Sequence, residues 1–407
     1  MKTLIVSAYA CEPLKGSEPA VGWNWVLQLA QKNRVHVITR ANNQKVIEAH
    51  VPQDVKENLV FHYYDTSDFI RKLKKRDKGL YFYNFCWQIG IVKVARSIAR
   101  SEHIDYVIHL TFGSIWMPTF LPLLNIPFIW GPVGGGECVP LSFLSVLPWK
   151  QRIVQCYRYL LNATIIINPF VMLPTCKAKA ILVRTPNTQN IFPKFLKKKT
   201  YVLLETAMDE KIFERRKRNY ETNCVKLVIS ARLISIKNIP LAIRSLHYIS
   251  TDKPWTLTII GSGPDIGIIN KEISQRGYKN VNVIPFMPRE EALNLIQDSD
   301  IFVFPSLKEG GTWALMEAMA MGLPVVCVNW AGMAVETNDE TAIRLPISTP
   351  KQMEIDMGMA ITRLIDDSSL RKHIGIAARQ RIKEVFSWKS KGDFMENLFS
   401  QLEKINT

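Results

Sequence analysis

The chain has 407 residues, of which 52 are Lys or Arg and 36 are Asp or Glu, so that its net charge is +16. This length predicts two domains of ordinary size, and the composition is that of a globular protein without low-complexity tracts or sustained repeats. The 7 cysteines form no CxxC pair and are odd in number, which excludes a disulfide or zinc framework and indicates reduced thiols.

The positive charge is concentrated in the first half of the chain. Residues 1–205 contain 26 Lys and Arg against 12 Asp and Glu, whereas residues 206–407 contain 26 against 24. A basic half predicts an anionic partner, which is a nucleic acid, an acidic membrane face or a phosphorylated substrate. No segment resembles a nucleic-acid-binding motif, so we expect no nucleic-acid partner.

The N-terminal segment alternates between strand and helix patterns. Residues 4–8 predict a strand, 11–19 a loop, 21–32 a helix and 35–38 a second strand, which is the start of a doubly wound sheet. No GxGxxG follows the first strand, which disfavours a nicotinamide or flavin dinucleotide site. We interpret the N-terminus as a core strand rather than a signal peptide and expect a cytoplasmic protein.

Gly16 and Ser17 stand directly before the predicted first helix. Free N–H groups at a helix N-terminus bind anions, so this loop is a candidate phosphate site. A plain tight turn has the same residue types, and spacing alone does not separate the two interpretations.

Two segments of the first half combine cations with hydrophobic residues. Residues 69–100 read as helical, with a basic cluster at 71–78 and aromatic residues at 81–87. They form either a solvated face beside a core face or a patch that lies on an anionic membrane. Residues 141–161, which include Trp149 and Lys150, predict an amphipathic helix that is a second candidate for membrane or lipid contact.

Residues 106–110 predict a strand that carries His109 at its carboxyl end. Such a histidine is either structural or faces a ligand crevice. Residues 110–136 contain no charged side chain, but four prolines interrupt them, so a buried helix, loop and strand is expected instead of a transmembrane helix. Gly135 and Glu137 lie in the sequence GPVGGGE, a loop in which backbone can approach a ligand closely.

The second half begins after a polar run at residues 214–223. Residues 226–230 predict a strand that leads to Arg232 and Lys237, and residues 255–260 predict a strand that runs into the turn GSGP. The two cations are either solvated surface charge or a pair that stabilises a phosphate leaving group.

Residues 301–328 read as strand, loop, helix and strand. Glu309 lies in the loop before two glycines, and Glu317 lies in an otherwise apolar helix that Thr312 could cap. Two such carboxylates are usually surface charge, but the glycines and the apolar helix favour a ligand-binding loop.

This segment resembles the EGFGLxxxEAMAxGxPV signature of retaining nucleotide-sugar glycosyltransferases of family 4. The match covers Pro305, Ser306, Glu309, Gly310, Glu317, Ala318, Met319, Ala320, Gly322, Pro324 and Val325. It departs from the signature at Gly311, Thr312 and Trp313, where Phe-Gly-Leu is usual. Arg232 and Lys237 match the family's GRLxxxKG segment, with Asn238 in place of its glycine, and residues 261–264 match its GxGP turn.

The resemblance implies an α/β protein of the GT-B fold, in which two Rossmann-like doubly wound domains face each other across a cleft. We expect an N-terminal acceptor-side domain at residues 1–207 and a nucleotide-sugar (donor) binding domain at residues 208–385. A C-terminal helix at residues 386–407 would cross back to the first domain.

The resemblance also implies roles for individual residues. Glu309 would orient the donor sugar, Arg232 and Lys237 would neutralise the diphosphate, and His109 would lie near the sugar and the acceptor, which makes these four the candidate catalytic residues. Glu317 would hold the ribose hydroxyls. The expected donor-binding residues are Gly16, Ser17, Gly261, Gly263, Met287, Gly310, Gly311, Thr312 and Glu317. We assign Gly135 and Glu137 to the acceptor side and expect no metal ion or cofactor.

The expected function is therefore that of a retaining glycosyltransferase, of hexosyltransferase type, in bacterial cell-surface polysaccharide synthesis. It would move a sugar from a nucleotide-diphosphate sugar to a hydroxyl of a glycan or lipid-linked acceptor, with peripheral contact with an anionic inner membrane face. Two alternatives stay open, which are a nucleotide-sugar epimerase of GT-B type and a non-enzymatic protein that binds anionic surfaces.

Overall fold

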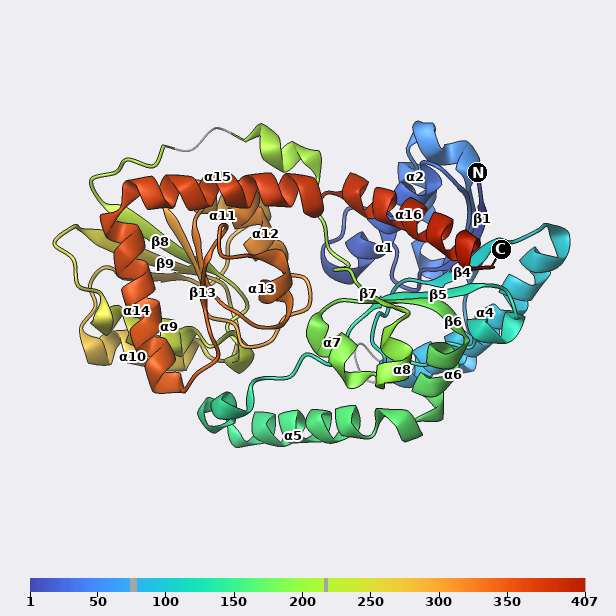
Figure 1. Cartoon of the computed structure of the whole chain (residues 1–407), viewed down its shortest axis with the longest axis horizontal. Helices are drawn as coiled ribbons and strands as arrows, with labels where there is room; N and C mark the ends of the chain where they lie inside the picture. Colours follow the sequence, from blue (N-terminus) through green and yellow to red (C-terminus); the bar gives the residue numbers. More distant parts are fainter. Residues whose placement is uncertain (74–78, 216–218, 407) are drawn as a thin grey trace. The chain divides into compact units, whose positions relative to one another are not determined.

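The computed structural model describes residues 1–73, 79–215 and 219–406 (Figure 1). Contacts divide the chain into two compact units. The first consists of Met1–Gly136, Leu160–Glu205 and Trp388–Thr407, and the second of Glu137–Tyr159 and Thr206–Ser387. Each unit is built around one parallel β-sheet, as expected for strands that alternate with helices.

The described strands of the first unit form a sheet in the order β3-β2-β1-β4-β5-β6-β7, and every pair is parallel. The strands are β1 (Thr3–Ser7), β2 (Arg34–Arg40), β3 (Leu59–Tyr64), β4 (Tyr106–His109), β5 (Phe128–Val133), β6 (Ala178–Val183) and β7 (Thr200–Val202). The strand order reverses between β1 and β4, so the loops that follow these two strands lie at the topological switch point.

Helices cover both faces of this sheet (Figure 1). Helices α1 and α16 pack together, and the ring of Phe399 on α16 stacks on Tyr106 of β4 with 4.9 Å between centroids. Helices α4 and α6 contribute Trp87 and Val171 to the hydrophobic core on the opposite side. The helices are α1 (Ser17–Ala30), α2 (Gln44–His50), α3 (Asp68–Leu73), α4 (Leu80–Ser101), α6 (Pro169–Lys177), α7 (Pro186–Ile191), α8 (Lys194–Lys197) and α16 (Trp388–Asn406).

The aromatic segment after residue 80 is divided between core and surface. Tyr83 and Trp87 are buried in the core, whereas Tyr81 and Phe82 are exposed. These residues thus form an exposed face beside a core face, the first of the two interpretations, because successive residues of a helix point to different sides. Four of the cations proposed for this patch, Lys74, Lys75, Arg76 and Lys78, lie outside the described residues.

The described strands of the second unit form a parallel sheet in the order β10-β9-β8-β11-β12-β13. They are β8 (Val225–Ser230), β9 (Trp255–Ile260), β10 (Val281–Ile284), β11 (Ile301–Phe304), β12 (Val325–Val328) and β13 (Ile343–Leu345). Strands β11 and β12 are entirely buried, which explains their continuous apolar sequences. The switch point of this sheet lies between β8 and β11.

The helices of the second unit also form two layers (Figure 1). Helix α9 packs against α10 and α14, and α12 packs against α11 and α15. The helices are α9 (Ile239–Ser245), α10 (Ile266–Arg276), α11 (Arg289–Gln297), α12 (Trp313–Ala320), α13 (Ala331–Glu336), α14 (Pro350–Asp366) and α15 (Ser368–Val385). The predicted α/β class, with two Rossmann-like doubly wound sheets, is confirmed.

The contacts of one segment place it in a different unit from the domain in which the sequence boundaries had put it. Residues Glu137–Tyr159 belong to the second unit by their contacts, although they precede the last strands of the first sheet. The segment contains the 3-10 helix η4 (Leu141–Val146) and most of helix α5 (Trp149–Ala163). None of the described helices is long and apolar enough to cross a bilayer.

Candidate functional site

The loops at the carboxyl ends of β8, β9 and β11 bring together most of the residues expected to bind the donor. In a parallel doubly wound sheet, ligands bind beyond the carboxyl ends of the strands, beside the switch point. Lys237 follows β8, Gly261 and Gly263 follow β9, and Glu309 follows β11. The second unit therefore places these predicted residues at the edge of its sheet where a ligand is expected.

The loop after β8 holds Lys237 in a buried position. Backbone hydrogen bonds from Ala231 N to Ile260 O (3.0 Å) and from Leu233 N to Ser262 O (2.9 Å) tie this loop to the turn after β9. The short helix η7 (Ser235–Lys237) then ends at Asn238, which has a φ of 52°. Asn tolerates this left-handed conformation better than other non-glycine residues, which explains how it replaces the expected glycine.

Lys237 forms an ion pair with Glu309. The Lys237 Nζ donates a hydrogen bond to Oε1 of Glu309, and the Ser306 hydroxyl donates to the same oxygen. The loop that carries Glu309 is tied to η7 by a bond from Leu307 N to Ile236 O (2.9 Å). Both side chains of the ion pair are almost fully buried, so the pair is little screened by water.

Arg232, the second expected cation, differs from Lys237 in its exposure and in its partners. Its side chain is exposed and forms no ion pair with any residue that the structure describes. It is thus held less firmly than Lys237 at the same edge of the sheet.

Gly261 and Gly263 allow the turn after β9 to approach the loop after β8. Their φ angles are 150° and 159°, which favour glycine. A Cβ atom at Gly261 would lie 1.9 Å from Ala231 O, and one at Gly263 would lie 2.2 Å from Leu233 O. No larger residue fits at either position without movement of the adjacent backbone.

The loop between Glu309 and α12 is packed from both sides. A Cβ atom at Gly332 would lie 1.5 Å from Gly310 O, and one at Gly311 would lie 2.0 Å from the Thr206 hydroxyl. The Thr312 N–H donates a hydrogen bond of 2.5 Å to the carboxylate of Glu336, a fully buried residue of α13. Thr312 is the N-cap residue of α12, as predicted, but its hydroxyl makes no capping bond.

Glu317 lies in α12 and is paired with a residue that sequence reasoning missed. Arg289, at the start of α11, donates a hydrogen bond of 2.5 Å to Oε1 of Glu317. Burial raises the pKa of Glu317, and the positive charge of Arg289 opposes this rise. Arg289 also lines a pocket of about 310 Å³, together with Asp209 and Trp313.

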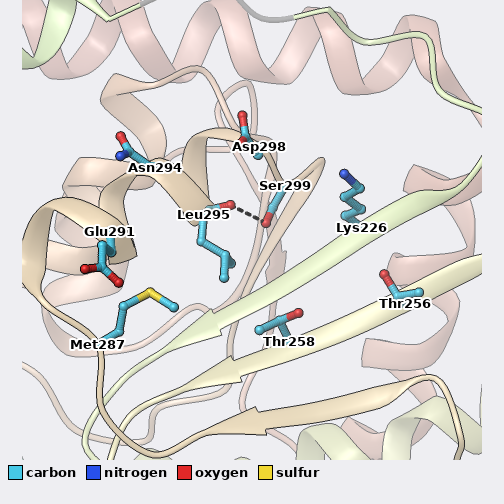
Figure 2. A pocket seen from close by; sticks show the side chains of 9 residues that line it. All are labelled: Lys226, Thr256, Thr258, Met287, Glu291, Asn294, Leu295, Asp298 and Ser299. Carbon is cyan, nitrogen blue, oxygen red and sulfur yellow. Dashed lines mark hydrogen bonds between the residues drawn. The ribbon is translucent and has the colours of Figure 1, made fainter.

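Met287 lies apart from these loops. It lines a groove of about 440 Å³ between α11 and the sheet. Figure 2 shows Met287 and Leu295 directed toward Thr258 of β9, with Lys226 of β8 farther along the groove. Its other lining residues are Thr256, Glu291, Asn294, Asp298 and Ser299.

Lys308 is a second residue that sequence reasoning missed. Burial, together with the charge of Arg158, lowers the pKa of its ammonium group to about 8. The negative charges of Glu137 and Glu309 oppose this effect. Glu137, expected on the acceptor side, therefore lies in the second unit near Lys308, in a segment that Trp330 Nε1 anchors by a hydrogen bond of 2.9 Å to Cys138 O.

The remaining predicted residues belong to the first unit. Gly16 and Ser17 are exposed at the start of α1, and Ser17 has a φ of 58°. The carboxylate of Glu18 accepts a hydrogen bond of 3.1 Å from Gly113 N, which connects this loop to the one after β4. The two loops therefore meet at the switch point of the first sheet.

His109 ends β4 and is fully buried. Burial lowers its pKa to about 4, although the backbone of Phe112 opposes this effect, so the imidazole is neutral near pH 7. Gly135 has a φ of 151°, and a Cβ atom there would lie 2.6 Å from the side chain of Ile115.

Some of the site residues that were not predicted stand next to recognisable sequence motifs, and others do not. Ser306 belongs to the Pro-Ser pair of the quoted motif, and Arg289 follows Met287 by two positions. Glu336 has no comparable signal, because its partner, the Thr312 N–H, comes from another segment, and the charges of Arg158 and Glu137 that act on Lys308 are also distant in the sequence. Among the described residues, no group of three or more His, Cys, Asp or Glu side chains could hold a metal ion.

The part of the chain that contains these loops matches a known protein family. Residues 210–381 match the family described as Glycosyl transferases group 1. This segment, which is less than half of the chain, is similar to that family, and we call it the group 1 domain. The group 1 domain includes Arg232, Lys237, Glu309 and Glu317, and it ends within α15.

Curated relatives match a similar length of sequence. An uncharacterized glycosyltransferase from Methanocaldococcus jannaschii is 27% identical over 198 residues, which are 48% of this chain and 48% of that protein. The capsular polysaccharide biosynthesis glycosyltransferase CapM from Staphylococcus aureus is 28% identical over 176 residues, or 42% of this chain and 45% of CapM. The chain thus spans about half the length of the curated relatives it matches.

The likeness in structure extends beyond the group 1 domain. A sucrose-phosphate synthase from Thermosynechococcus elongatus has a TM-score of 0.63 at 14% identity, with 100% of both chains covered. The predicted GT-B fold is therefore confirmed.

Proposed function

We propose that the chain is a retaining glycosyltransferase that moves a sugar from a nucleotide-diphosphate sugar to a hydroxyl of a glycan or lipid-linked acceptor. The observation that carries the proposal is the buried ion pair of Lys237 and Glu309 at the switch point of the group 1 domain. An ammonium group and a carboxylate held in this way provide a fixed cation for a phosphate and a fixed acceptor for sugar hydroxyls.

Each residue then has a distinct task. When the bond between sugar and diphosphate breaks, negative charge grows on the leaving phosphate, and Lys237 and Arg232 stabilise that charge. Glu309 accepts hydrogen bonds from sugar hydroxyls and orients the sugar. Glu317 accepts hydrogen bonds from the ribose hydroxyls. In a retaining reaction without a protein nucleophile, the leaving phosphate itself takes the proton of the incoming hydroxyl on the same face of the sugar.

We propose that His109, Gly135 and Glu137 contribute to the acceptor side. His109 is neutral near pH 7 and can accept or donate a hydrogen bond without a charge. Glu137 and Gly135 belong to the loop after β5 and are proposed to contact the acceptor. CapM, whose name assigns it to capsular polysaccharide synthesis, supports a glycan or lipid-linked glycan as the acceptor.

We also propose that the reaction needs no metal ion, because two protein cations are available for the diphosphate. Treatment of the purified protein with EDTA is then expected to leave sugar transfer unchanged. Restoration of a lost activity by Mg²⁺ or Mn²⁺ would contradict this part of the proposal.

The first experiment is a thermal-shift panel with UDP, GDP, ADP, CMP and NAD. A ligand at about one hundred times its dissociation constant stabilises the folded state by about 2.7 kcal/mol. We expect one nucleoside diphosphate to raise the melting temperature, and Glu317→Ala to reduce the rise at the same ligand concentration. A shift with NAD alone, or with none of the five, would contradict the proposal.

The second experiment follows the fate of the donor by NMR. Transfer to an acceptor with the anomeric configuration kept supports the proposal. Conversion of the donor to an epimer without any acceptor identifies the chain as an epimerase instead.

A further inference from the structure

Helix α5 presents a hydrophobic stripe that no described element covers. Trp149, Ile153 and Tyr157 are spaced four residues apart, so they lie on one side of the helix. Their exposed fractions are 65%, 59% and 59%, which are far above those of core residues. Leu141 and Val146 of the preceding helix η4 are exposed as well.

The other side of the same helix is anchored. Gln155, the one buried residue of α5, accepts a hydrogen bond of 3.3 Å from Val139 N. The Tyr159 hydroxyl, one turn later, donates a bond of 2.9 Å to Val139 O. Arg152 donates to the carbonyl groups of Leu147 and Ser145, which fixes the corner between η4 and α5. The hydrophobic stripe is therefore held facing away from the segment that anchors the helix.

The charge of this segment is of one sign. Within the second unit, residues 138–159 contain Lys150, Arg152 and Arg158 and no Asp or Glu. Lys150 is exposed beside the stripe, with its Nζ 5.5 Å from the centroid of the Trp149 ring. A stripe of Trp, Ile and Tyr bordered by cations matches a bilayer with anionic headgroups, because the apolar side chains enter the acyl boundary while the cations stay at the phosphates.

We propose that residues 141–157 form a surface that binds an anionic lipid bilayer. A second copy of this chain is a poorer occupant, because two such faces would bring Lys150 and Arg152 of each copy together, and residues 141–157 contain no carboxylate to offset them. Binding to a bilayer requires no donor, so this surface can be tested without any sugar nucleotide.

The test is flotation of the full-length protein with vesicles. We expect the protein to float with vesicles of equal parts phosphatidylcholine and phosphatidylglycerol, to stay behind with phosphatidylcholine alone, and to be released by high salt. Ile153→Ser is expected to weaken binding about tenfold and Lys150→Gln about fivefold.

Matched control variants carry the same changes elsewhere in the second unit. Ile376 on α15 is exposed to a similar extent, at 55%, and Lys372 lies on the same helix, so Ile376→Ser and Lys372→Gln are expected to bind vesicles like the wild type. A thermal shift with the nucleoside diphosphate that is kept in Ile153→Ser shows that this variant is folded and that the donor site is intact.

Three outcomes would overturn the proposal. One is the absence of flotation with anionic vesicles, and another is equal flotation with neutral vesicles. The third is a dimer, seen by analytical ultracentrifugation, that Ile153→Ser dissociates while the wild type does not float. None of these outcomes bears on the proposed sugar transfer, which the donor panel tests separately.

Discussion

Lys237 and Glu309 lie 72 residues apart in the sequence, yet the ammonium group of one donates a hydrogen bond to the carboxylate of the other. The contact exists because β8 and β11 are neighbours in the second sheet, so the loops at their carboxyl ends meet. The Ser306 hydroxyl completes the arrangement by donating to the same carboxylate oxygen. The sheet thus holds a cation and an anion in fixed positions before any ligand binds.

The ion pair can be measured by a double-mutant cycle with Lys237→Met, Glu309→Gln and the double variant. We expect a coupling of about 1–3 kcal/mol in unfolding free energy, because each single change leaves a buried polar group without its partner. Each single variant should also lose about 100- to 1000-fold in sugar transfer, the size expected for one preorganised charge at a reacting centre. Additive stabilities combined with full activity would contradict the assigned role.

Glu317→Gln is expected to weaken binding of the nucleoside diphosphate about ten- to a hundredfold. The change removes charged hydrogen bonds of about 1.5–3 kcal/mol to the ribose. Isothermal titration calorimetry measures the effect, and an unchanged affinity would remove Glu317 from the ribose site.

Arg289→Gln tests the partner of Glu317. Burial raises the pKa of Glu317 and Arg289 opposes the rise, so without the arginine the carboxylate takes up a proton at higher pH. The variant should therefore lose more affinity for the nucleoside diphosphate at pH 6 than at pH 8. An equal loss at both pH values would show that Arg289 acts in another way.

Gly332→Ala should displace the loop that carries Glu309. The new Cβ atom would lie 1.5 Å from Gly310 O, which is backbone and cannot move alone. We expect a loss of about 1–3 kcal/mol in stability, together with loss of transfer activity in the folded variant. Gly267→Ala is the control, because nothing lies within 4 Å of that Cβ position on α10. Wild-type activity in Gly332→Ala would show that the loop tolerates the shift.

Substitutions of Asn238 can test how much the left-handed backbone conformation at this position costs in stability. Its φ of 52° disfavours residues with an ordinary side chain, so Asn238→Ala should destabilise the protein by about 1–2 kcal/mol. Asn238→Gly should be close to neutral, because glycine adopts this conformation freely but gains entropy in the unfolded chain. Urea denaturation of the three proteins gives the order, and equal stability of the alanine variant would contradict the argument.

Because His109 is buried, we expect the unfolding free energy to depend on pH. Its pKa is lowered from 6.5 to about 4 by burial, so between these pH values the unfolded chain binds a proton that the folded chain does not. The stability contributed by the neutral histidine is therefore complete above pH 6.5 and is lost as the pH falls toward 4, by about 3 kcal/mol.

His109→Gln removes this dependence. The difference in unfolding free energy between the wild type and this variant should shrink by that amount from pH 7 to pH 4. The control is His373→Gln, which changes an exposed histidine on α15 and should leave the dependence as it is. A His109→Gln variant with the same pH profile as the wild type would show that the histidine is not the group that titrates.

The alternation of strands and helices was predictable because it rests on local patterns. The buried strands β11 and β12 appear in the sequence as apolar runs bounded by Pro, Gly and Ser, and the helix between them carries good helix formers. The candidate roles of Glu309 and Lys237 were also accessible from the sequence, since both belong to a family motif with defined spacing.

The sequence by itself therefore determined the α/β class and the residues that can carry charge at the edge of the second sheet. Only the tertiary structure decided which partner each charge has, as the pairing of Glu317 with Arg289 shows. It also decided that Glu137 lies near Lys308. At the start of α12, the carboxylate of Glu336 accepts a hydrogen bond from the Thr312 N–H, whereas the Thr312 hydroxyl makes no capping bond. Hydrophobic periodicity is a property of neighbouring residues, whereas the partner of a buried polar group depends on which distant loops the folded sheet brings together.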